Sequence, residues 1–216
     1  ITTDTKGNIE TKGNVTFSDI TNQIVTQTNS TVQIENLTGS EYIAGGNLYI
    51  SGNVNSSIIT SNAKAPDDES YSLDLKVVEN GSEITLNDGS AYIQSLNDSK
   101  LTVNGGRAEN IYFVNKNSEV YINGGSYSGI GTISNGTTVT INNGVEDSNT
   151  AISTANDSTI INTLGTTEVH NSYNTDIKNS GTISVVNLQS GSSFTKTKGT
   201  STITTEITKY VIDIEC

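Results

Sequence analysis

The sequence predicts an all-β fold, a right-handed parallel β-helix (β-solenoid) that forms a single domain over residues 1–216. Three observations lead to this prediction. A short motif recurs at a regular interval, apolar residues alternate with polar ones inside each copy, and Asn and Gly follow each copy at fixed positions. We expect about ten coils of about 19 residues each, because a repeat of this length is typical of β-helices.

The composition suits a thin core. Only 32% of the residues are hydrophobic and 6% are aromatic, and the chain has no Trp or Met. Charged residues make up 16%, which separates the chain from highly charged disordered proteins. We therefore expect a folded chain that uses its apolar residues in thin layers.

The motif occurs four times at nearly constant spacing. The copies are Gly81-Ser-Glu-Ile-Thr-Leu-Asn-Asp-Gly89, Asp98-Ser-Lys-Leu-Thr-Val-Asn-Gly-Gly106, Asn117-Ser-Glu-Val-Tyr-Ile-Asn-Gly-Gly125 and Gly136-Thr-Thr-Val-Thr-Ile-Asn-Asn-Gly144. Intervals of 17, 19 and 19 residues separate their first apolar residues, Ile84, Leu101, Val120 and Val139. Ile160 follows after a further 21 residues, and we expect Val15, Val32 and Leu48 to continue the series toward the N-terminus.

Each copy is predicted to be a strand followed by a sharp turn. Val120-Tyr-Ile122 alternates apolar and polar residues, as a strand with one buried face does. Asn and Gly adopt positive φ more readily than other residues, so both are expected in the turn. We expect the equivalent Asn side chains to stack as a ladder of amides. The predicted turn and ladder residues are Asn87, Asn104, Asn123, Asn142, Gly89, Gly106, Gly125 and Gly144.

Residues 61–80 interrupt the repeat and are predicted to form an insertion that loops out from the coil. Insertions in solenoids map to loops, and such loops often carry binding residues. A solvated loop, a protein or glycan contact and a calcium site are the alternatives, although the ligand spacing of known calcium loops is missing. The candidate partner-contact residues are Asp67, Asp68, Glu69 and Tyr71.

Several functional classes fit the sequence poorly. A net charge of -12 disfavours binding to nucleic acid, and no apolar run is long enough for direct membrane insertion. Enzymes built on β-helices need convergent acids and bases, whereas this chain has one His, His170, and one Arg, Arg107. We therefore predict no enzyme activity and no cofactor. An ice-binding Thr-x-Thr face is also disfavoured, because charged residues such as Glu83, Lys100 and Glu119 interrupt it.

The repeated units between Gly81 and Gly144 resemble the passenger domains of self-associating and diffuse-adherence autotransporter adhesins. They are equally similar to adhesin-like β-helix proteins of archaeal and bacterial surfaces. The resemblance implies an extracellular rod on a cell surface that binds a second copy of itself, a host glycan or a protein. Two alternatives remain open: a structural subunit of a surface filament, sheath or S-layer, and a glycan-binding spike of the phage type.

The predicted ladder can be tested with Asn123→Leu. Leu cannot accept or donate the amide hydrogen bonds, and each such bond contributes about 1 kcal/mol to stability. The melting temperature of the variant should fall while any binding activity is retained. An unchanged melting temperature in a thermal unfolding scan would count against the ladder.

Overall fold

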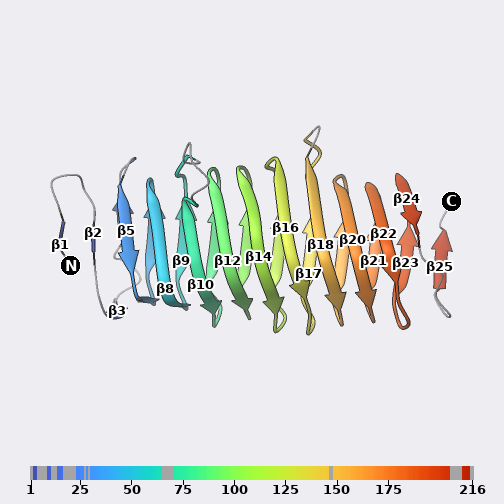
Figure 1. Ribbon diagram of the computed structural model, residues 1–216, viewed down its shortest axis with the longest axis horizontal. Coiled ribbons are helices and arrows are strands. Elements are labelled where there is room, and N and C mark those ends of the chain that lie inside the picture. The colour runs from blue at the N-terminus through green and yellow to red at the C-terminus, as the bar shows by residue number, and fades with distance from the viewer. Residues whose placement is uncertain are drawn as a thin grey trace.

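The protein is a parallel β-solenoid of about 9 turns with roughly 18 residues in each turn. The computed structural model describes residues 2–3, 9–10, 14–16, 23–26, 28, 30–64, 71–145, 148–204 and 211–214. Within these residues all regular structure is β-strand. The coils lie side by side along one axis and form a rod (Figure 1). The predicted fold class is confirmed, with turns slightly shorter and fewer than expected.

Two sheets run along the rod. Sheet A contains β1 (Thr2–Thr3), β2 (Ile9–Glu10), β3 (Asn14–Thr16), β5 (Thr31–Ile34), β6 (Asn36–Thr38), β8 (Asn47–Asn55), β10 (Leu73–Glu79), β12 (Ser90–Asn97), β14 (Arg107–Asn115), β16 (Tyr127–Ile133), β18 (Asn149–Asn156), β20 (Thr166–Tyr173), β22 (Thr182–Leu188) and β24 (Thr200–Ile203). Sheet B contains β4 (Gln23–Thr26), β7 (Glu41–Ala44), β9 (Ile58–Ser61), β11 (Glu83–Leu86), β13 (Lys100–Val103), β15 (Glu119–Ile122), β17 (Thr138–Ile141), β19 (Thr159–Asn162), β21 (Asp176–Asn179), β23 (Ser193–Lys196) and β25 (Val211–Ile214).

The strands of successive coils pair in parallel and in register. The predicted anchors Ile84, Leu101 and Val120 are direct neighbours in sheet B, and Val139 and Ile160 continue the row. The strands of sheet A descend in front of the fainter, ascending strands of sheet B as the chain advances from left to right (Figure 1). The coil is therefore right-handed, as predicted.

The predicted continuation toward the N-terminus is wrong. Val32 and Leu48 do pair, but they lie in sheet A, whereas Ile84 lies in sheet B. Val15 pairs with Leu37, and the true neighbour of Ile84 is Ile59. Val32 and Leu48 resemble the anchors of sheet B because both sheets supply an apolar-polar-apolar run in every coil. The period alone does not show to which sheet such a run belongs.

The core consists of columns of aliphatic side chains between the two sheets. The central column of sheet A is Ile50, Leu75, Ile93, Ile111, Ile130, Ile152, Val169 and Val185, none more than 2% exposed. Each buried side chain of this size contributes about 1.5 to 3 kcal/mol. The strands of sheet A also bend: in β12 both Gln94 and Ser95 lie outside the core, between the buried Ile93 and Leu96. This bend brings a second row, which includes Leu96, into the core.

A buried hydroxyl column, which the sequence analysis missed, stabilises the corner where sheet A leads into sheet B. Its members are at most 7% exposed, and a residue with positive φ directly precedes each of them. Ser118 donates a hydrogen bond to the Asn115 carbonyl at 2.6 Å, and the Ser82 hydroxyl accepts one from the Ser57 backbone N–H at 3.1 Å. The column satisfies backbone groups that the corner would otherwise leave buried and unpaired. It comprises Ser40, Ser57, Ser82, Ser99, Ser118, Thr137, Ser158, Thr175 and Ser192.

The opposite corner, from sheet B to sheet A, holds the predicted Asn and Gly residues. Asn104 donates to Asn87 at 2.9 Å and Asn123 donates to Asn104 at 3.2 Å. The row extends backwards, because Asn87 donates to Asn62 at 2.8 Å. Asn142 instead accepts a hydrogen bond from Thr163 at 2.9 Å. These exposed amides form a ladder on the outside of the corner.

Among the described residues of this corner, only glycines adopt positive φ. Gly89, Gly106 and Gly125 adopt it, whereas Gly144 and the four predicted Asn residues do not. The expectation that Asn and Gly both bend the chain in this way is therefore wrong for Asn. The Asn residues directly follow their sheet B strands, and after Asn87, Asn104 and Asn123 the left-handed residue comes two positions later.

A pair of glycine substitutions separates backbone strain from steric clash. Gly106 and Gly81 have similar φ values of 73° and 75°. A Cβ at Gly106 would lie 2.2 Å from the Gly89 carbonyl oxygen, whereas a Cβ at Gly81 would meet no atom within 4 Å. Gly81→Ala should cost about 1 kcal/mol from strain alone. Gly106→Ala should cost several times more, measured by urea unfolding, and equal losses would contradict close stacking at this corner.

Candidate binding face

The insertion lies between β9 and β10, so the predicted bounds of 61–80 are too wide: Ser61 ends β9, and Leu73–Glu79 form β10, an ordinary strand of the next coil. Ile59 and Ile84 are neighbours in sheet B although 25 residues separate them, compared with 17 between Ile84 and Leu101. Three of the four candidate contact residues, Asp67, Asp68 and Glu69, lie outside the described residues. The fourth, Tyr71, lies just before β10 against the outer face of sheet A.

A row of tyrosine rings crosses this face. Tyr71 and Tyr92 have ring centroids 5.4 Å apart, and those of Tyr92 and Tyr112 are 5.5 Å apart. The hydroxyl of Tyr71 also accepts a hydrogen bond from the Asn110 amide, two strands along the sheet. Tyr112 and its neighbour Phe113 are about half exposed, at 46% and 50%. We call Tyr71, Tyr92 and Tyr112 the tyrosine row.

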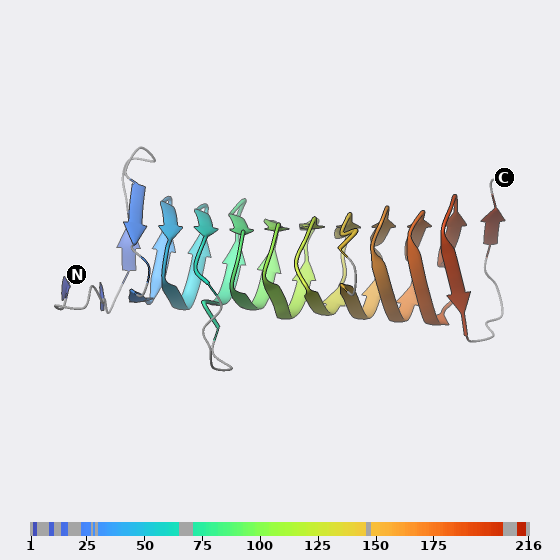
Figure 2. The same ribbon diagram turned by 90° about the horizontal axis from the view of Figure 1, so that it is seen from above.

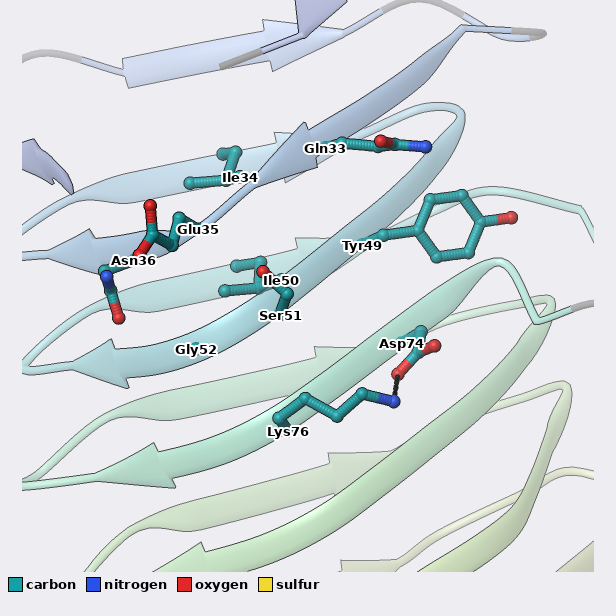
Figure 3. A pocket seen from close by; sticks show the side chains of 10 residues that line it. All are labelled: Gln33, Ile34, Glu35, Asn36, Tyr49, Ile50, Ser51, Gly52, Asp74 and Lys76. Carbon is teal, nitrogen blue, oxygen red and sulfur yellow. Dashed lines mark hydrogen bonds and ion pairs between the residues drawn. The ribbon is translucent and has the colours of Figure 1, made fainter. Parts of the chain in front are cut away.

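A groove of about 470 Å³, groove 1, lies at the N-terminal end of the row. Gln33, Tyr49 and Asp74 occupy matching outward positions on β5, β8 and β10, and their side chains line one side of it (Figure 3). Gly52 lies on the other side of the groove. A side chain would not fit at this position, because an added Cβ would lie 2.3 Å from Oδ1 of Asn36. The groove is lined by a phenol, amides, carboxylates and the ammonium of Lys76.

A second groove of about 240 Å³, groove 2, lies at the other end of the row, over β14, β16 and β18. It exists because the outward positions of β16 between Tyr127 and Thr132 are glycines, Gly129 and Gly131. A Cβ on either would lie within 2.5 Å of a carbonyl oxygen of β14. Its lining also includes Tyr112 of β14, Tyr127 of β16, and Ala151 and Ser153 of β18.

The cations of this face are already paired. The Lys76 ammonium lies 3.0 Å from the Asp74 carboxylate and 4.5 Å from the ring centre of Tyr92. Arg107 lies 2.6 Å from Glu109. These are the two Lys or Arg residues in the described strands of sheet A. Both pairs are partly exposed, so each contributes about 1 kcal/mol or less to stability. Their main effect is to leave the face without an uncompensated positive charge.

The remaining predicted features give no catalytic constellation among the described residues. His170 lies exposed on β20, 3.2 Å from Glu168, and Arg107 is used in its ion pair. The described part of the chain holds no group of three or more His, Cys, Asp and Glu side chains suited to a metal ion.

On sheet B, Glu83, Lys100 and Glu119 lie in one outward row, so the charges that disfavoured an ice-binding face do lie together there.

The tyrosine row and both grooves were not predicted from the sequence, although a signal for the row was present in it. Tyr92 and Tyr112 each directly neighbour buried isoleucines of the core, Ile93 and Ile111, within their strands. An aromatic residue next to a buried residue of a strand points outward and is exposed. Two such residues that are 20 positions apart in the sequence lie on adjacent coils. Their recurrence close to the repeat length indicated a row on one face.

The chain matches no protein-family model, and neither the curated proteins nor the solved structures gave a significant match. Within the described residues no helix is long and apolar enough to cross a membrane.

Proposed function

We propose that this chain is an adhesive binding rod of a cell surface, which acts outside the cell and contacts its partner through the outer face of sheet A. The observation that carries the proposal is the tyrosine row with a groove at each end of it. Exposed aromatic side chains bind partners well because they offer a large contact area at a low cost in conformational entropy. Their hydroxyls add hydrogen bonds.

The face is better suited to a saccharide than to a protein. Among the described residues of sheet A, the exposed large hydrophobic side chains are all aromatic: Tyr112, Phe113 and Tyr173. Protein interfaces usually bury a more apolar centre. Sugar rings instead present C–H faces that stack on aromatic rings and hydroxyls that bond amides and carboxylates. Groove 1 supplies an amide and a carboxylate through Gln33 and Glu35, and groove 2 supplies an amide through Asn110.

The solenoid suits this role mechanically. Its strands pair from coil to coil along the rod, so side chains on different coils keep fixed positions relative to one another. Contacts on successive coils engage one long partner, and several weak contacts then add up to firm attachment. A rod that displays them along its length is the expected shape for an adhesin.

The proposal is tested with a double variant, Tyr92→Ala with Tyr112→Ala, displayed on cells. Aromatic anchors at the centre of a binding face often contribute more than about 1 kcal/mol each, so adhesion to host-cell or glycan-coated surfaces should fall by about tenfold or more. The matched control is Tyr121→Ala on the outer face of sheet B. There a hydrogen bond to Glu119 at 2.9 Å raises the pKa of the Tyr121 phenol. The control should adhere like the parent.

Other outcomes would favour the alternatives. If both variants adhere like the parent, sheet A is not the contact face and the proposal is wrong. Settling of displaying cells that persists in both variants would indicate self-association through another surface. Polymers of the purified chain in electron micrographs would favour a filament, sheath or S-layer subunit, and trimers would favour a spike.

A further inference from the structure

We infer that the ligand of this face is an uncharged glycan chain that lies along the rod axis and spans both grooves. The inference rests on the proposed function and specifies its ligand class. It follows from three observations: where the grooves lie, what lies between them, and which charges the face carries.

The positions of the grooves set the direction of the chain. Groove 1 is centred on β8 and groove 2 on β16, and both open on the outer face of sheet A. Four strand-to-strand steps separate these strands, which corresponds to roughly 19 Å at about 4.8 Å per step. The tyrosine row occupies the strands between them. A ligand that uses both grooves therefore crosses the strands over the row and runs parallel to the long axis (Figure 2).

The charges exclude an acidic ligand. An anionic sugar needs an uncompensated cation, but Lys76 and Arg107 are held by Asp74 and Glu109. Glu35 lines groove 1 and has no cationic partner among the described residues. With a net charge of -12 on the whole chain, a uronic or sialic acid polymer would be repelled. The amides, hydroxyls and rings of the face need no charge on the ligand.

The experiment measures the affinity of the full chain for two series of oligosaccharides of increasing length. One series is uncharged, composed of hexose and N-acetylhexosamine oligomers, and the other is composed of uronic acid oligomers. We expect the uncharged series to bind, with affinity that rises from the disaccharide and levels off once a chain reaches both grooves. Between about 0.05 M and about 0.5 M salt the affinity should change by less than about twofold, because a neutral ligand is not screened.

Ala151→Phe tests whether one chain uses both grooves. Ala151 lies on β18 and lines groove 2, so a bulky ring there should occupy the groove. The longest oligomers should then bind only as tightly as short ones, while short oligomers keep their affinity for groove 1. Ser184→Phe is the control, because Ser184 occupies the same outward row two strands further on and lines neither groove.

Three results would overturn the inference: tighter binding of the uronic acid series, affinity that does not depend on length, or no effect of Ala151→Phe on long oligomers. Absence of binding to both series, while the Tyr92 and Tyr112 variant still loses adhesion, would overturn the glycan ligand and leave the adhesive face intact. If the variant of Tyr92 and Tyr112 adhered like the parent, the proposed function itself would be overturned.

Discussion

The whole structure depends on hydrogen bonding in register between the backbone of each coil and that of the next. A single coil of roughly 18 residues buries only a few aliphatic side chains. At about 1.5 to 3 kcal/mol each, these cannot offset the backbone entropy lost, about 1 to 2 kcal/mol for every ordered residue. Stability therefore comes from the contacts between coils, as in other repeat proteins.

Register in turn depends on the two corners. One corner combines a left-handed residue such as Asn117 with a buried hydroxyl such as Ser118, which bonds the backbone of its own coil. The other combines the amide ladder with glycines stacked so closely that Gly106 has no space for a Cβ. The hydroxyl corner repeats its local structure from Ser40 to Ser192, and the amide ladder repeats from Asn62 to Asn123, so successive strands start and end at matching positions. A coil can then accept the inserted residues after β9 without losing register, since Leu73 still pairs with Leu48 and Ala91.

This arrangement separates stability from function. Inward positions repeat Ile, Val and Leu, because each must pack on its counterpart in the next coil. Outward positions face no such requirement, and they change from Asp74 to Tyr92 to Asn110 to Gly129 along a single row. The proposed binding face is built from this variation. Tyrosines provide the ridge, glycines leave the space beside it, and paired ions keep the face without excess positive charge.

The sequence by itself determined the fold class, the handedness expected of it, and the stacking of Ile84, Leu101, Val120 and Val139, because strand period and turn residues are local properties. The positions of the Asn and Gly residues at one corner could also be predicted from the sequence. Only the tertiary structure decided that Val32 and Leu48 belong to the other sheet, that Asn62 starts the ladder, and that Ser and Thr line the second corner. It alone placed Tyr71 beside Tyr92 and opened the grooves around Gly52 and Gly129. These features depend on coil lengths that vary from 16 to 25 residues, so the neighbours of a residue are fixed only when the coils are stacked.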